Sequence, residues 1–368
     1  MVLVALLLAV VCLAYANGAN DNFKGVATLF GSGASDYRRA LGWATATTLL
    51  GSLAAVVLAR TLLEKFTGQG LVDDALVANA DYAAAVALGA GLTVLLATSA
   101  GLPVSTTHGL VGSLVGAGFA AGSTINLAQL GGSFFLPLLA GPLLAIVATG
   151  LAYPVFRFTR QRLGITANTC LCVGNEIVEI VPASSHAAAL ERAEQLTVRI
   201  GDAVTCRSRY EGQVLGIQAE AAVDRLHFLS AGVVSFARGL NDTPKIAALL
   251  LLSPLLGGFS SMALVGVAIA VGGLMSARRV AETMSRKITT LNHGQGFTAN
   301  LMTGLVVIGA SRLGMPVSTT HVSCGALFGL GAVTRQASWV TIARILGAWV
   351  ITLPLGAALG AASFQILR

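Results

Sequence analysis

Gly-Leu-Pro-Val-Ser-Thr-Thr-His occupies residues 101–108, and Gly-Met-Pro-Val-Ser-Thr-Thr-His occupies residues 314–321, 213 positions later. A proline ends one helix, and Ser-Thr-Thr is typical of the N-terminal cap of the next. Each copy therefore predicts a point in an apolar region where one helix stops and another starts. Helix N-termini carry free N–H groups and partial positive charge, which favours a bound anion. The candidate ligands of such an anion are Ser105, Thr106, Thr107, Ser318, Thr319 and Thr320.

The composition indicates a membrane protein. Of the 368 residues, 55% are hydrophobic and 11% are charged, and the mean hydropathy is +0.79. Soluble domains are about one quarter charged. We therefore expect an all-α polytopic protein whose main partner is the lipid bilayer of the cell (plasma or inner) membrane. The apolar N-terminus lacks a basic start and an Ala-x-Ala site, so it is predicted to be a first helix and not a signal peptide.

Charged residues are concentrated in one segment. Sixteen of the 39 lie between Arg157 and Arg225, and the others are spread over the rest of the chain. This pattern indicates a soluble insert, residues 163–225, within a membrane body. The net charge of +7 lies largely near predicted helix ends. Such a distribution is typical of cytoplasmic anchoring and does not predict nucleic-acid binding.

We expect the insert to be a small α+β unit. The predicted strands are residues 169–173, 176–181, 198–200 and 213–218, around a helix near residues 187–195. Cys170 and Cys172 suggest a metal site, but a Cys-x-Cys pair alone lacks the spacing of a zinc site. We favour two reduced thiols on opposite faces of a strand. The five cysteines are scattered, so no disulfide framework is predicted.

A second repeated element interrupts the apolar segment that opens each half. Residues 20–24 read Asn-Asp-Asn-Phe-Lys, and residues 241–245 read Asn-Asp-Thr-Pro-Lys, 221 positions later. The apolar runs on either side are each shorter than the roughly 20 residues that a helix needs to span a bilayer. We therefore expect a broken helix in both halves. The residues expected at the breaks are Asn20, Asp21, Asn241 and Asp242.

Each half is predicted to cross the bilayer about five times, as a broken helix, two spans, the proline-broken crossing and a last span. An odd number makes the second half enter from the opposite side, so residues 1–162 and 226–368 are expected to be inverted repeats. The basic loops agree, because Arg38, Arg157 and Arg278 fall on one side together with the insert. Both termini are then outside and the insert is cytoplasmic. Inverted repeats with discontinuous helices are a transporter architecture.

The two Asn-Asp segments and the two Pro-Val-Ser-Thr-Thr-His segments together resemble the inorganic phosphate transporter (PiT) family of cation-coupled carriers. The resemblance covers both membrane halves and not the insert. It implies that the Asn-Asp and Ser-Thr-Thr segments line a shared site for phosphate and a cation. The chain departs from the pattern in one place, because Asn22, Phe23 and Lys24 stand where many relatives have Val-Ala-Asn.

The site residues suit this chemistry in more than one way. Asn20 and Asn241 are candidates for both the phosphate and the cation. Asp21 and Asp242 could ligate Na⁺, since hard cations prefer oxygen ligands, or accept a hydrogen bond from a protonated phosphate oxygen. No cofactor and no metal other than Na⁺ is expected, and H⁺ is the alternative coupling ion.

The flanking basic residues have two interpretations each. Lys24 and Lys245 either compensate the charge of the anion or extend to the membrane surface. Arg238 is expected near the surface or in a cytoplasmic vestibule and not as a ligand. His108 and His321 are expected to hydrogen-bond a neighbouring helix, although titration would allow proton coupling.

Four functions are compatible with a membrane protein of this kind. The favoured one is a secondary active transporter that imports phosphate with Na⁺ or H⁺ by alternating access. A sulfate permease on the same scaffold is the main alternative. An anion channel would need rings of cationic side chains. A membrane enzyme would need a nucleophile or a metal set, for which Asp21 and Asp242 with His108 and His321 are the one candidate, and the repeat symmetry favours binding over directional chemistry. The sequence leaves open whether the chain forms a homodimer.

Overall fold

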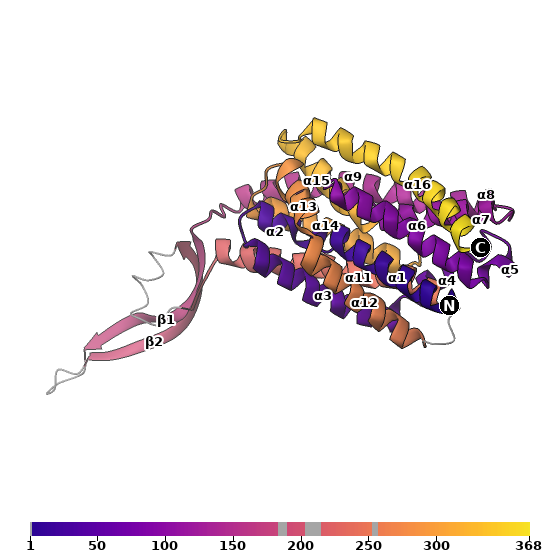
Figure 1. The fold of residues 1–368 in the computed structure, drawn as a ribbon. Coiled ribbons are helices and arrows are strands. Elements are labelled where there is room, and N and C mark those ends of the chain that lie inside the picture. The colour runs from indigo at the N-terminus through magenta and orange to yellow at the C-terminus, as the bar shows by residue number, and fades with distance from the viewer. Residues whose placement is uncertain (1, 183–189, 203–214, 252–256) are drawn as a thin grey trace. The chain divides into compact units, whose positions relative to one another are not determined.

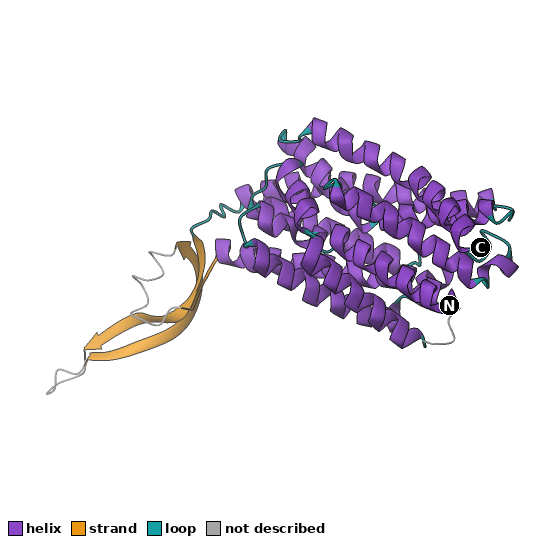
Figure 2. Ribbon diagram, in the orientation of Figure 1, coloured by secondary structure: helices purple, strands orange, loops and turns teal. Residues whose placement is uncertain are grey.

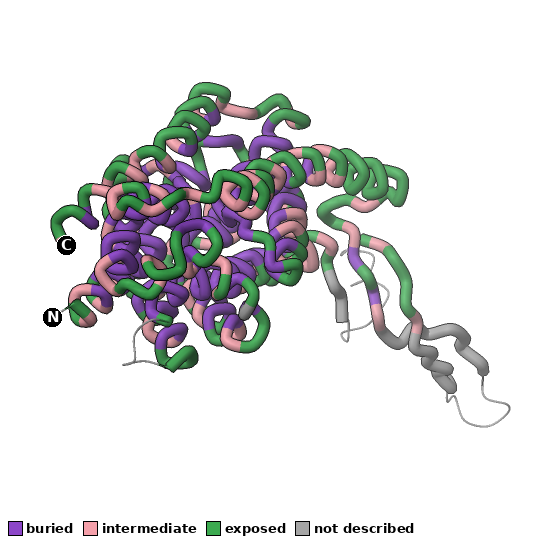
Figure 3. The backbone as a smooth tube through the Cα atoms, turned by 90° about the vertical axis from the view of Figure 1, so that its right-hand side faces the viewer, coloured by how far each residue is buried: buried purple, intermediate pink, exposed green. Residues whose placement is uncertain are grey.

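The computed structural model describes residues 2–182, 190–202, 215–251 and 257–368. The chain divides into two compact units, one formed by Met1–Tyr153 with His227–Arg368 and the other by Pro154–Leu226. The first unit is a helical bundle, and the second contains a β-sheet (Figures 1 and 2). Buried residues fill the interior of the bundle (Figure 3).

Long helices make up most of the bundle. They are α1 (Val2–Asp21), α3 (Tyr37–Leu58), α6 (Ala80–Ser99), α7 (Thr106–Ala120), α9 (Leu136–Arg162), α11 (Ala219–Ala247), α12 (Gly258–Ser276), α14 (His293–Arg312), α15 (Thr319–Thr334) and α16 (Trp339–Leu367). Shorter helical turns connect them: η1 (Lys24–Val26), α2 (Ala27–Gly31), α4 (Arg60–Lys65), α5 (Asp74–Val77), α8 (Leu127–Gln129), η2 (Leu130–Phe135), η3 (Ala248–Leu250), α13 (Arg278–Glu282) and η4 (Thr283–Lys287). Six segments of the described chain are long and apolar enough to cross a membrane. The protein is therefore a multi-pass membrane protein, as predicted.

The first repeated motif reverses the chain between α6 and α7. The N–H of Gly101 donates to the carbonyl of Thr98 at 2.9 Å, and the N–H of Leu102 donates to the carbonyl of Ala97 at 3.0 Å. This is the Schellman pattern, and Gly101 takes the positive φ of 68° that it requires. Ser105 then caps α7, because its hydroxyl accepts the N–H of His108 at 3.1 Å. We call residues 100–105 the first tip.

The second motif builds the same turn between α14 and α15. Gly314 has a φ of 62°, and its N–H donates to the carbonyl of Ser311 at 3.1 Å. The N–H of Met315 donates to the carbonyl of Ala310 at 2.9 Å. Ser318 caps α15 by accepting the N–H of His321 at 3.2 Å. The predicted stop and restart of a helix is thus confirmed in both copies, and we call residues 313–318 the second tip.

Both motifs are tips of helical hairpins, which corrects the predicted proline-broken crossings. The far end of α7 returns to the start of α6, since the N–H of Asp73 donates to the Ser123 hydroxyl at 2.9 Å. The far end of α15 likewise returns to the start of α14, where Thr290 bonds Gln336 at 2.8 Å. A glycine with positive φ followed by a proline turns the chain back on itself. Counting apolar segments could not distinguish that turn from a kink within one crossing.

The two predicted helix breaks differ. α1 ends at Asp21, followed by a turn and the short helices η1 and α2, so the first break is confirmed. α11 continues through Asn241 and Asp242 to Ala247, so the second predicted break is wrong. Pro244 lies inside α11 without ending it. A proline removes one helical hydrogen bond, and membrane helices tolerate this where neighbouring groups satisfy the freed carbonyl.

Glycines allow the helices that carry the Asn-Asp segments to approach their neighbours closely. A Cβ atom on Gly18 of α1 would lie 1.9 Å from the carbonyl oxygen of Ile269 in α12. A Cβ on Gly239 of α11 would lie 2.1 Å from that of Thr48 in α3. These two glycines occupy matching places in the repeated motifs. Their packing fixes the position of the Asn and Asp side chains that follow.

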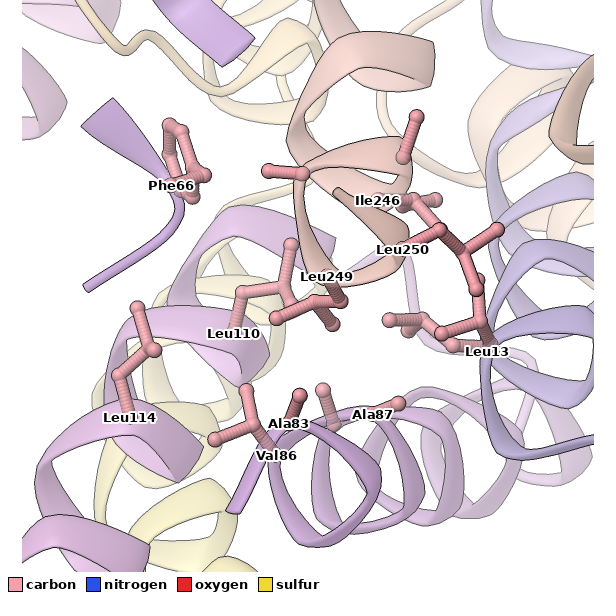
Figure 4. Close-up of a cluster of buried hydrophobic side chains, with 14 of the residues drawn as sticks. Leu13, Phe66, Ala83, Val86, Ala87, Leu110, Leu114, Ile246, Leu249 and Leu250 are labelled. Atoms are coloured by element: carbon pink, nitrogen blue, oxygen red, sulfur yellow. The ribbon is translucent and has the colours of Figure 1, made fainter. Parts of the chain in front are cut away.

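An apolar cluster lies beside the buried polar residues. Leu13 of α1, Leu110 of α7 and Leu249 of η3 meet in this cluster together with side chains of α6 and with Phe66 (Figure 4). These residues come from both halves of the sequence. Their burial removes water from the centre of the bundle, which strengthens the electrostatic interactions made there.

The second unit has a three-stranded antiparallel sheet in the order β2-β1-β3, with β1 (Thr169–Pro182), β2 (Leu190–Asp202) and β3 (Leu215–Gln218). The first two predicted strands are one strand, β1. The predicted helix near residues 187–195 is wrong from residue 190 onward, because those residues belong to β2; residues 187–189, and residues 213–214 of the last predicted strand, lie outside the described residues. Strand pairing over thirteen residues outweighed the helix propensity of the Ala- and Glu-rich segment.

The cysteine interpretation also needs correction. Cys172 is disulfide-bonded and Cys170 is free, so they are not two reduced thiols. Both are 3% exposed. Residues two positions apart in a strand point to the same face, not to opposite faces.

The close helix packing at Gly18 gives a direct test. Gly18→Ala should lower the melting temperature of the detergent-solubilised protein, because overpacking of this kind costs about 1–3 kcal/mol. Gly42→Ala in α3 is the matched control, since its Cβ would meet nothing within 4 Å. The control should be neutral or slightly stabilising. Equal melting temperatures for the two variants would contradict the packing.

Candidate functional site

Asp21, at the end of α1, is buried and surrounded by donors from both halves. Its Oδ1 contacts the ammonium of Lys24. Its Oδ2 accepts hydrogen bonds from Asn17 at 2.9 Å and from the Thr106 hydroxyl at 3.1 Å. The hydroxyl of Thr320, from the second hairpin, lies 3.5 Å from Oδ1. One carboxylate thus joins α1 to the first turns of both α7 and α15.

Asp242 occupies the corresponding place on α11. Its Oδ1 lies 3.5 Å from Nζ of Lys245 and accepts a hydrogen bond from Asn241 at 2.9 Å. Its Oδ2 lies 3.4 Å from the Thr319 hydroxyl and 3.7 Å from Nε of Arg238. The two Asn-Asp segments therefore hold matching environments, although one lies at a helix end and the other within a helix.

The two lysines connect the tips to each other. Lys24 donates to the carbonyl of Val104 in the first tip and to the hydroxyl of Thr320 beside the second. Lys245 donates to the carbonyl of Val317 in the second tip and to the hydroxyl of Thr107 beside the first. Both lysines are at most 3% exposed. Neither lysine therefore extends to the membrane surface, and that one of their two predicted interpretations is wrong.

Direct contact between the hairpins completes the junction. The Thr320 hydroxyl donates to the Val104 carbonyl at 2.9 Å. The N-terminal turns of α7 and α15 thus lie at one place, as the anion hypothesis requires. All six Ser and Thr candidates are buried there. Ser105 and Ser318 act as helix caps, so their hydroxyl oxygens already accept a backbone N–H.

Asn20 and Asn241 fix the tips to the helices. Asn20 donates to the carbonyl of Leu102 at 3.1 Å and accepts the N–H of Val104 at 3.1 Å. Asn241 donates to the carbonyl of Val317 at 3.1 Å. Both side chains belong to the buried cluster, and each one binds the tip of its own half of the sequence.

The sequence reasoning misplaced Arg238 and missed Asn17. Arg238 is 1% exposed and donates to Asn17 at 2.8 Å and to Asn22 at 3.0 Å, so its expected place near the surface is wrong. Asn17 links both carboxylates, at 2.9 Å to Asp21 and 3.4 Å to Asp242. Asn17 could have been found from the sequence, because it is an amide residue one helical turn before Asn20 in an otherwise apolar helix.

Matching hydroxyls also lie behind the two asparagines. Thr98 accepts a hydrogen bond from Asn20 at 2.8 Å, and the Ser311 hydroxyl lies 3.4 Å from the side-chain oxygen of Asn241. These two residues are 213 positions apart, the same spacing as the tips. The repeat spacing could have found them.

His108 and His321 pack against each other, with ring centroids 4.5 Å apart. His321 also stacks on Trp349, whose indole N–H donates to the carbonyl of Pro103 at 3.1 Å. Within the part of the chain that the structure describes, Nδ1 of His108 and Nε2 of His321 are buried without a hydrogen-bond partner. The expected hydrogen bond from each histidine to a neighbouring helix thus stays a prediction, and the ring contacts that the structure gives are those between the two histidines and between His321 and Trp349.

A cavity approaches the first tip. It has a volume of about 480 Å³ and is lined by Ala19, Thr98, Ser99, Arg279 and Glu282, among others. Arg279 donates to the carbonyl of Ser99 at 2.8 Å. Because Thr98 bonds Asn20, the cavity ends one side chain away from the buried site. Its arginines could attract an anion toward the site.

The charges of the buried cluster favour an anion. Lys24, Lys245 and Arg238 carry three positive charges in their ordinary states, and Asp21 and Asp242 carry two negative ones. The cluster therefore has a net charge of +1, next to the positive ends of α7 and α15. Buried ionisable groups inside a membrane bundle are costly and mark functional sites.

The profile of the phosphate transporter family matches residues 17–360, which include both tips and both Asn-Asp segments. This chain belongs to the phosphate transporter family. Its function is therefore phosphate transport, and it is not an enzyme.

Individual relatives agree with the family. The chain is 30% identical to a probable low-affinity inorganic phosphate transporter of Rhizobium meliloti, over 98% of this chain and 94% of the relative. It is 27% identical to the chloroplastic inorganic phosphate transporter 2-1 of Arabidopsis thaliana, over 94% of this chain and 69% of the relative. A solved structure described as the sodium-dependent phosphate transporter has the same fold, with a TM-score of 0.72, 20% identity and coverage of 100% and 98%.

The buried ion pairs predict a non-additive effect on stability. Asp21→Asn leaves Lys24 as an unpaired buried charge, which costs about 3–5 kcal/mol. Combining Asp21→Asn with Lys24→Gln should restore part of this loss, measured as the melting temperature of the purified protein. Asp74→Asn, at an exposed position, is the control and should change little. A double variant less stable than Asp21→Asn would contradict the pairing.

Proposed function

We propose that the chain imports inorganic phosphate, coupled to Na⁺ or H⁺, by alternating access of two inverted halves, residues 1–162 and 226–368. The supporting observation is the contact between the two hairpins, at 2.9 Å between Thr320 in the first turn of α15 and Val104 in the first tip, within a buried cluster of net positive charge. Phosphate would bind between the first turns of α7 and α15. Their hydroxyls and N–H groups would replace its hydration.

The arrangement of the hairpins supports alternating access. The ends of the first hairpin meet residues 71–73, and the ends of the second meet residues 288–290. A short helix covers each hairpin at its turn. Lys65 of α4 donates to the carbonyl of Gly314 in the second tip, and Arg279 of α13 donates to that of Ser99, just before the first tip. Movement of one tip away from its cover would open the site to that side alone.

The carboxylates favour phosphate over sulfate. At neutral pH phosphate carries a proton that it can donate to a carboxylate, whereas sulfate carries none. Asp21 or Asp242 could accept a hydrogen bond from this phosphate O–H if phosphate displaced the threonine now bonded to the carboxylate. A sulfate ion would face the same carboxylate without a hydrogen bond, so like charges would repel.

The proposed orientation in the membrane follows from the distribution of basic residues. We propose that the protein lies in the cell membrane with the insert, residues 163–225, in the cytoplasm, because the basic loops flank it. Trypsin added to inside-out vesicles should then cleave the insert, and trypsin added to right-side-out vesicles should not. Cleavage only in right-side-out vesicles would reverse the orientation, and the disulfide at Cys172 would fit that result.

Phosphate uptake tests the function. Proteoliposomes containing the protein should accumulate labelled phosphate above the level of empty liposomes. Equal concentrations of unlabelled phosphate should compete, and sulfate should not. Competition by sulfate as strong as that by phosphate would favour the sulfate permease.

The helix caps test the site itself. Ser105→Ala combined with Ser318→Ala should raise the KM for phosphate about tenfold, which corresponds to about 1.4 kcal/mol of lost binding. Ser338→Ala is a matched control, because Ser338 precedes α16 without a side-chain cap bond. An unchanged KM in the double variant would remove the helix ends from the site.

A further inference from the structure

The ammonium group of Lys24 lies in a cage of oxygen atoms. The ligands are the amide oxygen of Asn20 at 2.8 Å, the carbonyl of Val104 at 2.9 Å, the hydroxyl of Thr320 at 2.6 Å and the carboxylate of Asp21. Carboxylate, carbonyl, amide and hydroxyl oxygens are the ligands that hard cations take in proteins. The cage has the composition of a cation site, and a lysine nitrogen occupies it.

Lys245 fills a second cage of the same kind. Its Nζ lies 2.7 Å from the carbonyl of Val317, 3.0 Å from the hydroxyl of Thr107 and 3.5 Å from the carboxylate of Asp242. The ring of Phe66 lies 5.6 Å away on another side. Each cage combines the Asp of one half, the tip carbonyl of that half and a threonine of the other hairpin.

The occupied cages are incompatible with free Na⁺ at the same positions. Each lysine is almost fully buried, so its ammonium has no aqueous space into which it could withdraw. A sodium ion sharing these oxygens would lie within about one ligand distance, 2.3–3 Å, of another positive charge in a water-poor environment. The oxygen atoms can stabilise one cation per cage, and the chain supplies that cation itself.

We propose that Lys24 and Lys245 are tethered cations that occupy both cation sites, so that phosphate transport by this chain does not depend on Na⁺. The proposal rests on the proposed function, since it concerns the coupling ion of the same site. Each ammonium joins the two hairpin tips as a bound cation would. Because the lysines stay with the protein, they contribute charge to the binding of phosphate and no ion flux to its transport.

Sodium binding tests the proposal without reference to transport. The melting temperature of the purified protein should be the same in NaCl and in KCl at equal ionic strength, and equilibrium dialysis with labelled Na⁺ should detect no bound ion. The double variant Lys24→Asn/Lys245→Asn keeps the other oxygen ligands and adds two amide oxygens. It should bind Na⁺ and gain a sodium-dependent rise in melting temperature.

Controls make these outcomes decisive. Lys287→Asn removes an exposed lysine and should behave as the unaltered protein. Bound Na⁺ in the unaltered protein would overturn the proposal. If the double variant does not fold, the single variants Lys24→Asn and Lys245→Asn each expose one cage, and failure of both to bind Na⁺ would likewise overturn it.

Transport gives the second readout. Labelled-phosphate uptake into proteoliposomes should differ less than twofold between an inward gradient of Na⁺ and one of K⁺ at the same pH. A tenfold or larger stimulation by Na⁺ would overturn the tethered-cation proposal and leave the phosphate transporter intact. Absence of uptake under every gradient would instead contradict the proposed function, while the binding measurement would still decide the occupancy of the cages.

Discussion

Burying five ionised side chains at the centre of an apolar bundle is the constraint on which the rest of the structure depends. Each charge loses its hydration there, and removing one partner of a buried pair leaves several kcal/mol uncompensated. The structure compensates by placing both carboxylates within reach of lysines, threonines and asparagines from both halves. No single helix supplies enough donors. The hairpin tips must therefore meet at this point, and the glycines of α1 and α11 must allow the helices to approach.

The hairpin tips combine two local signals in one short sequence. A glycine with positive φ ends the incoming helix, and a capped serine starts the outgoing one. Between them lie carbonyl groups that no helix uses, at Val104 and Val317. These carbonyls accept the lysine ammonium groups, so the same turn provides a positive helix end and a negative carbonyl side by side. A site of this kind can hold an anion and a cation in contact.

Much of this arrangement is readable from the sequence, because it depends on residue types with strong local preferences. Doubled Pro-Val-Ser-Thr-Thr-His predicted the caps, and doubled Asn-Asp predicted the buried carboxylates. The hairpins were not predictable from hydropathy, since α7 and α15 are apolar whether they cross the bilayer or return within it. The continuity of α11 through Pro244 and the burial of Arg238 depend on tertiary contacts. The pairing of β1 with β2 is equally non-local, which explains the wrong helix in the insert.

The lysines show how one residue can change which cation a set of oxygen ligands holds. Oxygen atoms that suit a free cation are present in both cages. The lysine of each Asn-Asp segment, Lys24 or Lys245, already supplies a positive charge to them. The common fold of this chain and a sodium-dependent transporter, at 20% identity, therefore does not determine which ion drives transport. In our proposal the residues that surround each oxygen cage determine it.

An experimental structure with bound phosphate, or with arsenate as a heavier analogue, tests the central claim most directly. The account predicts anion density that contacts the first turns of both α7 and α15, with the ammonium groups of Lys24 and Lys245 close by. Density confined to one hairpin, or located only in the cavity beside Arg279, would contradict a shared site at the meeting point of the two tips.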